Sequence, residues 1–488
     1  MSPPPEPKPV AALSRRRFLA ASGAAALAAG AGLALPGCGL PFAGGGRGKV
    51  AIVGAGLAGL IAALELERDG FEVVLLEARD RVGGRLRTAQ KPFYGEQTAE
   101  LGGEFIDRNH RVLLRYVRRL GLDLVDLRRF GGELDAAVYV EGERRSRDEV
   151  ATPEVQAEID RFHAEVESLA GPVHPADPPA GAAARLDERS VADLMDDLRL
   201  DADARTVLER ELRDDYTVEP KRLSLLFHAA LTKLYARVGD ADVEAFRVAG
   251  GNGRILEALI EEIDAKVDLE APVTRIEQRP EGVRVHAQTG REVDADFCIV
   301  ATPLRPLARI EFAPELPAVL AEAAERLQYG KATKVPLQFR RRVWLVDGLN
   351  ADAITDLPIG TTWESTVGQP GLGGIVMAYA SGEDGRRLAA FSDSERIRLA
   401  TDEMERVFPG SRRRVEAGAT AAWSVERYSL GSYAAYAPGQ VTRYWRALRR
   451  PVGRILLAGE HTDAYTGYME GAVRSGRRAA RAIARRAR

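Results

Sequence analysis

Three glycines near the start of the chain have the type and spacing that bind a phosphate group. Gly54, Gly56 and Gly59 form the pattern G-x-G-x-x-G in GAGLAG. Between a strand and a helix, such glycines allow a tight turn and let the backbone approach a pyrophosphate, which the positive N-terminal end of the helix attracts. Glu77 lies further along, at the separation where a carboxylate accepts hydrogen bonds from ribose hydroxyls. This pattern indicates dinucleotide binding, with FAD and NAD as the two options, and a purely structural turn is the alternative.

The elements that must position these residues follow from the spacing of apolar side chains. Residues 50–53 form an apolar run typical of a buried strand, residues 57–69 have helical spacing, and residues 71–76 indicate a second strand. Gly70 ends the helix. The sequence therefore predicts the βαβ start of an α/β domain.

A second glycine pair distinguishes between the two dinucleotides. Gly83, Gly84 and Arg85 follow Glu77 in EARDRVGGR. A flavin dinucleotide continues deeper into the protein at this point and again needs close approach of the backbone, whereas NAD does not, so the pair favours FAD. The segment ELGGEFI, residues 100–106, adds a third such site. Read alone, Gly-Gly-Arg is more often a surface turn.

A glycine-punctuated loop recurs close to the C-terminus, in GEHTDAYTGYMEGAVRSG, residues 459–476. We expect a helix to begin near residues 468–471. The N–H groups and dipole of such a helix stabilise negative charge, so the segment suits the opposite end of the same cofactor. A plain capped C-terminal helix is the alternative.

Length and composition limit the classes of function. The chain has 488 residues, of which 45% are hydrophobic, enough for two or three domains. The 69 basic and 71 acidic side chains give a net charge of −2, which argues against a nucleic-acid partner. Cys38 and Cys298 are the only cysteines, so a disulfide scaffold and a thiolate zinc cluster are excluded within one chain, and we expect no metal site.

The N-terminal segment has the features of an export signal. SRRRFLAAS places Arg15 and Arg16 before a mildly apolar Ala/Gly-rich run that ends at Leu35, which is typical of twin-arginine export. LPGCG then resembles a lipobox, although Pro36 departs from its usual pattern, and predicts a lipid anchor at Cys38. We expect a bacterial protein that is periplasmic or tethered to a membrane. A membrane anchor with an ordinary basic flank is the alternative.

The middle of the chain changes its pattern twice. Residues 108–234 are mostly helical, with Ser190 and Asp193 forming a capping box, and an Ala/Pro-rich loop from Gly171 interrupts them. After residue 250 the α/β pattern returns, ending in the apolar strand of ADFCIVATP. The chain therefore leaves the nucleotide domain, builds a second lobe and returns.

Taken together, the motifs resemble the flavin-containing amine oxidase family, which includes monoamine, polyamine and L-amino-acid oxidases. GAGLAGL, EARDRVGGR, ELGGEF, VAGGNGRI, IVATP, KATKVPLQF and LAGEHTDAYTGYMEGAVRSG occur in the family's order between about Lys49 and Ala482. The resemblance implies an FAD-binding Rossmann-like domain of the glutathione-reductase type, α/β, interleaved with a mixed-sheet and helical (α+β) substrate domain. The predicted division is 1–38 signal with lipobox, 39–48 flexible linker, 49–105, 246–305 and 426–488 FAD-binding domain, and 106–245 and 306–425 substrate domain.

The resemblance also assigns residues to the cofactor site. Glu104 follows LGG near the ring face, and Trp423 resembles a tryptophan that the family packs beside the cofactor. The expected FAD-binding residues are Gly54, Ala55, Gly56, Leu57, Ala58, Gly59, Glu77, Ala78, Arg79, Gly83, Gly84, Arg85, Leu101, Gly102, Gly103, Glu104, Val273, Trp423, Gly459, Glu460, Gly467, Tyr468 and Met469.

Three side chains are the expected catalytic residues. Tyr433 and Tyr468 match the two tyrosines that flank the substrate nitrogen in monoamine oxidases, although tyrosines are also common packing residues. Lys334 matches a lysine that is linked through water to the hydride-accepting nitrogen and assists the reaction with dioxygen; a lysine on a strand is more often solvated. Ser432 stands where some members carry the cysteine that bonds to flavin, so we expect FAD to be held non-covalently.

The expected activity is oxidation of an amine to an imine, with dioxygen as acceptor and hydrogen peroxide as product. A dehydrogenase or desaturase of the same fold that reduces a quinone or protein partner is the main alternative, and a flavoprotein with a degenerate site is another. Glu104 hints at a diamine, although a salt-bridged carboxylate is the more common role, while Arg108 and Arg247 are candidates to bind an amino-acid carboxylate. The sequence leaves the oligomeric state open, with a homodimer as one option.

Overall fold

The computed structural model describes residues 47–130, 134–239 and 242–487. The predicted export signal, the lipobox with Cys38 and most of the linker lie outside these residues. No helix in the described part of the chain is long and apolar enough to cross a membrane.

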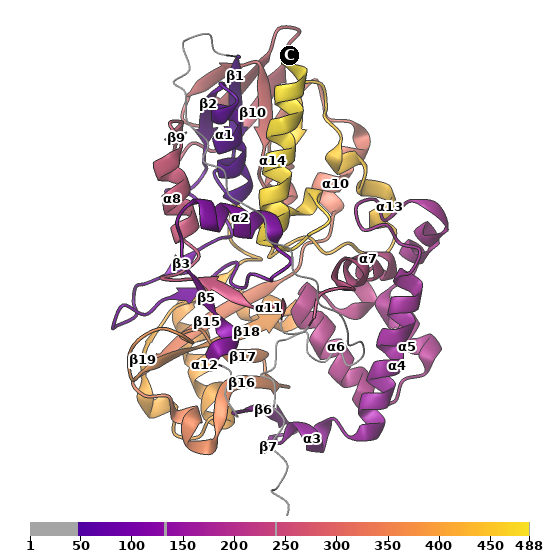
Figure 1. Cartoon of the computed structure of the whole chain (residues 1–488), viewed down its shortest axis with the longest axis vertical. Helices are drawn as coiled ribbons and strands as arrows, with labels where there is room; N and C mark the ends of the chain where they lie inside the picture. Colours follow the sequence, from indigo (N-terminus) through magenta and orange to yellow (C-terminus); the bar gives the residue numbers. More distant parts are fainter. Residues whose placement is uncertain (1–46, 131–133, 240–241, 488) are drawn as a thin grey trace, which may run out of the picture.

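The first lobe is built on a parallel five-stranded sheet in the order β21–β13–β1–β2–β9 (Figure 1). The predicted βαβ start is confirmed, because β1 is followed by the buried helix α1 and then by β2. The apolar strand predicted in ADFCIVATP is confirmed as β13. The strands are β1 (Lys49–Val53), β2 (Glu72–Leu76), β9 (Lys266–Asp268), β13 (Phe297–Val300) and β21 (Ile455–Leu457), and the helices that accompany them are α1 (Leu57–Arg68), α2 (Arg111–Arg119), α8 (Arg254–Glu262) and α14 (Met469–Arg486).

The C-terminal helix α14 packs directly on α1, which joins the two ends of the described chain. Gly476 permits this approach, because a Cβ at that position would lie 2.2 Å from the backbone oxygen of Ala58. The predicted start of this helix is also confirmed, since it begins at Met469. Two glycine-rich segments more than 400 residues apart are thereby placed side by side.

A smaller sheet and several short elements complete this lobe. The order β12–β11–β10–β14 makes a four-stranded sheet, and two short strand pairs, β3–β4 and β5–β8, lie apart from it. These elements are β3 (Thr88–Ala89), β4 (Ala99–Glu100), β5 (Leu124–Asp126), β8 (Phe246–Val248), β10 (Val273–Gln278), β11 (Val283–Ala287), β12 (Glu292–Ala295), β14 (Glu311–Ala313), α9 (Leu304–Leu307), α10 (Ala318–Arg326) and α13 (Gln440–Tyr444).

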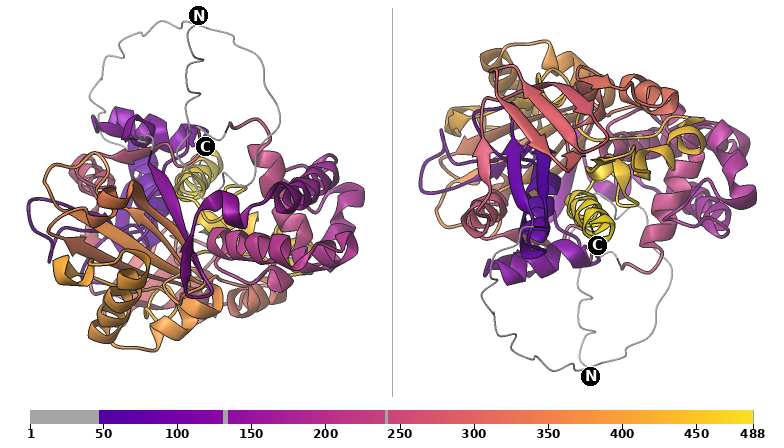
Figure 2. Two further views of the ribbon diagram at one scale, coloured as in Figure 1. Left: turned by 90° about the horizontal axis from the view of Figure 1, so that it is seen from below. Right: turned by 90° about the horizontal axis from the view of Figure 1, so that it is seen from above.

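The second lobe combines a mixed eight-stranded sheet with a group of helices beside it (Figure 2). The strand order of this sheet is β19–β15–β18–β17–β16–β6–β7, and the eighth strand, β20, pairs with β15. The strands are β6 (Asp135–Val140), β7 (Glu143–Arg145), β15 (Ala332–Phe339), β16 (Leu349–Thr355), β17 (Thr361–Glu364), β18 (Gly374–Ser381), β19 (Val415–Gly418) and β20 (Ala421–Ala422), and the helices are α3 (Arg147–Val150), α4 (Pro153–Ala170), α5 (Val191–Leu198), α6 (Ala202–Tyr216), α7 (Leu225–Tyr235), α11 (Gly382–Ala389) and α12 (Asp393–Val407).

Local expectations for this lobe are confirmed in part. Ser190 and Asp193 form the predicted capping box at the start of α5. The segment 108–234 is mostly helical, but β6 and β7 interrupt it, since β6 pairs with β16 far along the chain, a partner that local sequence does not reveal. A 3₁₀ helix, Gly181–Glu188, begins within the predicted loop and extends beyond its end. Every residue of β15, the strand that carries Lys334, is buried.

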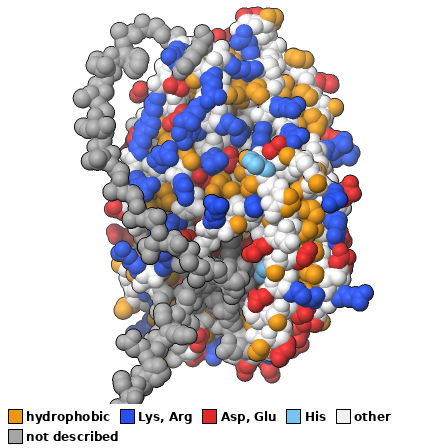
Figure 3. Space-filling view, turned by 45° about the vertical axis from the view of Figure 1, so that its right-hand side comes forward, with side chains coloured by type: hydrophobic (Ala, Val, Ile, Leu, Met, Phe, Trp, Pro, Cys, Tyr) orange, Lys and Arg blue, Asp and Glu red, His pale blue; other side chains and the backbone are white. Residues whose placement is uncertain are grey.

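The surface carries charges of both signs. On the face shown in Figure 3, Lys and Arg side chains gather over the upper part of the molecule, while Asp and Glu side chains are scattered among them and toward the lower edge. The net charge of the chain is close to zero, at −2, but the basic side chains are concentrated on one part of this face.

A buried carboxyl in the second lobe makes stability depend on pH. Oε2 of Glu403, on α12, accepts a hydrogen bond from the backbone N–H of Ile359 at 2.9 Å. Burial raises the pKa of Glu403 to about 7. Because the folded state binds this proton more tightly than the unfolded chain, the contribution of Glu403 is complete below its ordinary pKa of 4.5 and is lost as the pH rises through about 7.

Glu403→Gln removes this titration and keeps a hydrogen-bond acceptor. We expect the stability of the variant relative to the wild type to increase between about pH 5 and about pH 8, by up to ~3 kcal/mol. Thermal unfolding of both proteins across this range measures the difference. Asp393→Asn, at an exposed position on the same helix, is the control, and a pH-independent difference for Glu403→Gln would contradict the prediction.

Candidate active site

A cavity of about 450 Å³ is lined by residues from both lobes. Its first-lobe wall contains the glycine loops that follow β1 and β2, the 102–104 segment and the start of α14. Its second-lobe wall contains residues from α6, α7, β15 and β18. The segments singled out near residues 54, 83, 102 and 467 therefore meet around one space.

Two helices begin at this cavity. The N-cap of α1 is Gly56 and the N-cap of α14 is Tyr468, and among the described residues neither receives a side-chain cap. Leu57, Ala58 and Met469, in the first turns of these helices, line the cavity. Unpaired N–H groups and the positive ends of two helix dipoles thus favour negative charge in the cavity.

Glu77 holds the first loop together and faces the same cavity. Its Oε2 accepts from the backbone N–H of Ala55 at 2.9 Å, and its Oε1 accepts from the backbone N–H of Arg79 at 2.9 Å. A carboxylate oxygen accepts more than one hydrogen bond, so Glu77 retains capacity for the hydroxyls of a ribose. These features fit an extended dinucleotide.

An ion pair links the second glycine loop to the C-terminal segment. Nη1 of Arg85 donates to Oε1 of Glu460 at 2.8 Å, and Oε2 of Glu460 accepts from the backbone N–H of Gly467 at 2.9 Å. The carboxylate of Glu460 therefore links the backbone of Gly467 to the side chain of Arg85. It positions the loop that carries Tyr468.

Lys334 occupies a buried position on β15 and is held by three acceptors. Its Nζ donates to the backbone oxygens of Glu100 at 3.1 Å and Gly102 at 3.0 Å, and to Oε2 of Glu104 at 2.8 Å. Its side chain is 8% exposed. The alternative of a solvated strand lysine is therefore wrong.

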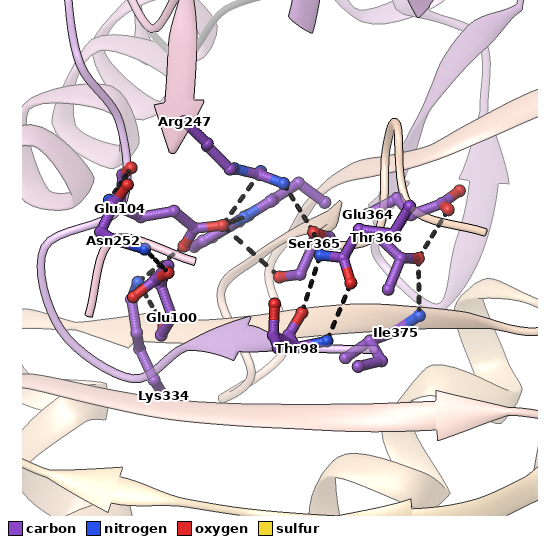
Figure 4. A network of polar contacts seen from close by, with 12 residues as sticks. Thr98, Glu100, Glu104, Arg247, Asn252, Lys334, Glu364, Ser365, Thr366 and Ile375 are labelled. Atoms are coloured by element: carbon purple, nitrogen blue, oxygen red, sulfur yellow. Dashed lines mark hydrogen bonds and ion pairs between the residues drawn. The ribbon is translucent and has the colours of Figure 1, made fainter. Parts of the chain in front are cut away.

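Glu104 is the centre of a buried charge network (Figure 4). Besides Lys334, its carboxylate receives Nη2 of Arg247 at 3.0 Å and Nε1 of Trp363 at 2.8 Å. Burial favours the neutral form of Glu104, but the charges of Lys334 and Arg247 outweigh this effect and lower its pKa. Glu104 is therefore the salt-bridged carboxylate of the alternative interpretation, and the hint that it recognises a second substrate cation is not supported.

The two arginines considered for an amino-acid carboxylate are also engaged elsewhere. Arg247 donates to the backbone oxygen of Ser365 at 2.7 Å in addition to its contact with Glu104. Arg108 pairs with Asp242 at 2.6 Å. Neither arginine lines the described cavity.

Tyr433 and Tyr468 both line the cavity and are fixed by different neighbours. Oη of Tyr433 donates to the backbone oxygen of Asp215 at 2.8 Å and lies 3.3 Å from Oη of Tyr379. The ring of Tyr468 packs against Tyr235, with the ring centroids 5.8 Å apart. The loop and the helix start that carry these tyrosines come from different parts of the chain, so tertiary structure sets their orientation.

Trp423 and Ser432 complete the wall near the cofactor site. Nε1 of Trp423 donates to the backbone oxygen of Leu101 at 2.7 Å, which fixes the indole beside the 102–104 segment. Oγ of Ser432 lies 2.7 Å from Oγ1 of Thr217. Cys298, in β13, is fully buried and does not line the cavity.

Nearly all residues predicted for the site line this cavity. The exceptions are Ala55, whose N–H contacts Glu77, Gly59, which packs behind the first loop, and Leu101, whose oxygen accepts from Trp423. Several other side chains that line the cavity could not be predicted, because no motif marks them and only the pairing of β15 with β18, or the packing of the second lobe, brings them there. These are Asp214, Asp215, Tyr216, Phe227, Leu231, Val243, Glu244 and Tyr379.

Removing the charge of Glu104 should destabilise the protein strongly. Glu104→Gln leaves the buried cations of Lys334 and Arg247 without their shared counter-ion, and we expect a loss of ~3–5 kcal/mol in the free energy of unfolding. Chemical denaturation of the flavin-loaded protein measures this loss. The double variant Glu104→Gln/Arg247→Gln removes one of the two uncompensated cations and should recover part of it; equal stability of the wild type and Glu104→Gln would contradict the assigned network.

The fold and the cavity define a two-lobed, dinucleotide-binding oxidoreductase of the flavoprotein class. Residues 57–484 match the model of the family described as "Flavin containing amine oxidoreductase". The chain belongs to this family, as the motifs suggested, and it is a flavin-dependent oxidoreductase.

Similar proteins cover nearly the whole described chain. The flavin-containing amine oxidase of Oncorhynchus mykiss is 29% identical over 456 residues, covering 89% of this chain and 85% of that protein. The L-amino-acid oxidase of Bothrops atrox is 28% identical over 469 residues, covering 90% and 88%. The structure of wild-type putrescine oxidase bound to putrescine superposes with a TM-score of 0.80 at 26% identity, covering 89% of this chain and 98% of that chain.

Proposed function

We propose that the protein is an FAD-dependent amine oxidase that converts an amine to an imine and reduces dioxygen to hydrogen peroxide. The observation that carries this proposal is the convergence of Lys334, Tyr433 and Tyr468 on the cavity that both uncapped helix N-termini also face. The relatives named above support oxidation of amines or amino acids as the class of reaction.

The walls of the cavity suit FAD. The first glycine loop and the start of α1 would hold the pyrophosphate, Glu77 the adenosine ribose, and the start of α14 the flavin end. When bound, FAD supplies the hydride acceptor and passes the electrons on to dioxygen. Because Ser432 offers no thiol and Cys298 does not line the cavity, this chain would hold FAD without a covalent bond.

The chain's own residues would orient the substrate more than they would exchange protons with it. Tyr433 and Tyr468 would confine the amine nitrogen between their rings, and Tyr379 fixes the hydroxyl of Tyr433. The buried ammonium of Lys334 would stabilise negative charge that develops on dioxygen as it is reduced. In the overall reaction, one amine and one dioxygen give one imine and one hydrogen peroxide. Water then hydrolyses the imine to a carbonyl compound and ammonia or an amine.

Anaerobic mixing with a panel of monoamines, diamines and amino acids tests this function. We expect at least one amine to bleach the flavin absorbance, and admission of air to restore the colour with stoichiometric peroxide. Rapid bleaching with slow recovery in air and rapid recovery with a quinone would instead support the dehydrogenase alternative. Absence of bleaching by every compound would overturn the proposal. Acid precipitation tests the mode of binding, because non-covalent FAD is released into the supernatant.

Export is a separate proposal that rests on the sequence of residues 1–38. Arg15 and Arg16 would direct the folded, cofactor-loaded protein through the twin-arginine pathway, and Cys38 would carry a lipid anchor. A variant with both arginines replaced by lysine should remain in the cytoplasm, and Cys38→Ala should shift the exported protein from the membrane to the soluble fraction. Normal export of the double-lysine variant would contradict the signal assignment.

A further inference from the structure

The helices α2 and α14 together carry ten arginines and a single acidic residue. Four of the arginines belong to α2, with the sequence RVLLRYVRR, and six belong to α14, with the sequence MEGAVRSGRRAARAIARR. The acidic residue, Glu470, is 1% exposed, and its carboxylate accepts from the backbone N–H groups of Val112 and Leu113 at the start of α2. Glu470 therefore joins the two helices beneath the surface, and the charge that they present to solvent is positive.

The arginines follow one side of each helix. On α2, Arg111, Arg115 and Arg118 are exposed, while Leu114 and Val117 between them are buried. On α14, arginines recur at positions 474, 477, 478, 481 and 485, and the buried residues of the same helix include 473, 476, 480 and 484. Side chains three or four residues apart share one face of a helix, so each helix presents a row of guanidinium groups to solvent.

Both rows belong to one surface of the first lobe. The two helices pack against each other, and Figure 1 and Figure 2 place them on the same side of this lobe. Figure 3 shows Lys and Arg side chains gathered over the upper part of the molecule, where the first lobe lies. We call this surface the arginine face and define it by the ten arginines of Arg111–Arg119 and Arg474–Arg486.

Neighbouring carboxylates neutralise only some of these arginines. The ion pairs are Arg119–Glu262 at 2.8 Å, Arg474–Asp463 at 2.9 Å, Arg477–Glu65 at 3.7 Å and Arg478–Asp463 at 3.7 Å. Within the part of the chain that the structure describes, the other six form no ion pair. Even when the exposed carboxylates of Glu257 and Glu261 on α8 are counted against them, the arginines remain in excess.

The first described residue, Arg47, lies at the same end of the lobe as the last turns of α14. Its backbone N–H donates to the oxygen of Gly70 at 3.1 Å, just after α1. The helices α1 and α14 pack along each other and both begin at the cavity, so their C-terminal ends lie together at the opposite end of the lobe. Cys38 and Arg47 are nine residues apart in the chain. A lipid on Cys38 would therefore keep this end of the lobe within ~30 Å of a membrane.

We propose that the arginine face binds the surface of a membrane that contains anionic phospholipids. A guanidinium group suits this partner, because it donates two parallel hydrogen bonds to a phosphate and always remains charged. A single lipid chain holds a protein only weakly to a bilayer, and a basic surface supplies the second signal that makes the attachment stable. Nucleic acid is disfavoured as the partner, because the chain as a whole has a net charge of −2.

This role goes beyond the proposed amine oxidation and does not depend on it, because none of the ten arginines lines the cavity. It complements the lipid anchor proposed at Cys38, and the two contributions can be measured separately. A protein without the lipid should still bind anionic membranes through the arginine face, although more weakly and in a way that salt suppresses.

Vesicle flotation tests the proposal with the full, flavin-loaded chain carrying Cys38→Ala, so that no lipid anchor contributes. We expect at least ~10-fold tighter binding to vesicles of phosphatidylglycerol and phosphatidylcholine in equal parts than to vesicles of phosphatidylcholine alone. The triple variant Arg111→Gln/Arg115→Gln/Arg118→Gln should weaken this binding by ~10- to 100-fold, the scale expected for three arginines near an anionic surface. Arg481→Gln/Arg485→Gln/Arg486→Gln on α14 should have a similar effect.

Two matched variants make the test specific. Arg341→Gln/Arg398→Gln/Arg413→Gln removes the same charge from exposed positions in the second lobe and should bind like the parent protein. Replacement of the three α2 arginines by lysine keeps the charge and should retain most of the binding. All variants share residues 1–46, so the differences between them report the arginine face alone. Flavin content and melting temperature verify that each variant is folded.

Equal binding to neutral and anionic vesicles, or an equal loss in the second-lobe control, would overturn the proposal. Tighter binding to duplex DNA than to anionic vesicles in the same buffer would also overturn it and would assign the face to nucleic acid. Because oxidation of an amine does not enter the measurement, failure of the proposed reaction would leave the flotation result unchanged.

Discussion

Replacement of Gly59 by alanine is expected to abolish flavin retention. A Cβ at this position would lie 2.0 Å from the backbone oxygen of Gly54, and a backbone atom in a tight loop cannot move aside without reshaping the loop. A side-chain carbon of Ile52, on β1, lies 3.4 Å from the same Cβ position, so α1 packs closely on the strand here and has little room to adjust. We expect the purified variant to contain less than ~10% of the wild-type flavin, because the first turn of α1 would no longer present its N–H groups to the pyrophosphate.

Absorbance in the flavin band relative to the protein band, before and after reconstitution with excess FAD, measures this effect. Gly239→Ala is the matched control: among the described residues, its Cβ would approach Oδ2 of Asp242, at an ordinary contact distance of 3.9 Å. Circular dichroism and the melting temperature of the apoprotein distinguish loss of the binding loop from general unfolding. Full flavin occupancy in a folded Gly59→Ala protein would show that the loop does not bind the cofactor as we propose.

Replacement of Lys334 by methionine is expected to slow the reaction of the reduced enzyme with dioxygen by ~10²-fold, the scale of a lost, preorganised charge in a buried site. Methionine retains the shape of the side chain and removes its charge. Reduction by the amine under anaerobic conditions should change much less, because the tyrosines proposed to confine the amine nitrogen are untouched. Stopped-flow measurements of the two half-reactions separate these effects.

Two further variants make this prediction specific. Lys331→Met removes a lysine that does not line the cavity and should leave both half-reactions unchanged. Lys334→Arg retains the charge but changes the shape and the donor geometry, so re-oxidation should be intermediate. If Lys334→Met re-oxidises at the wild-type rate, the assigned role of Lys334 is wrong, whatever its effect on stability through Glu104.

The local elements around the cofactor loops were predictable from sequence for a physical reason. A strand, a glycine turn and a helix are determined mainly by residues close together in the chain, and the pattern at 50–76 therefore predicted β1, α1 and β2 with boundaries accurate to one or two residues. The capping box at Ser190 and the start of α14 are equally local. Even the convergence of the two ends of the chain was predictable, because both segments carry glycines that suit the same extended ligand.

The roles of ionisable side chains were much less predictable. Glu104 in the sequence is a carboxylate after two glycines, with nothing to show whether it meets a substrate or a counter-ion. Its partners Arg247 and Lys334 lie on β8 and β15, 143 and 230 residues away in the chain, and only folding decides that all three meet in a buried network. The same limit applies to Asp215 and Glu244, whose positions in the cavity wall depend on how the second lobe packs against the first.

The sequence by itself determined the dinucleotide-binding start, the class of cofactor and the family, because close backbone approach requires glycine at fixed spacings and leaves a local signature. The tertiary structure alone decided which charges neutralise one another. A charge acts through space and not along the chain, so Glu104 is neutralised by two cations that lie far from it in the sequence.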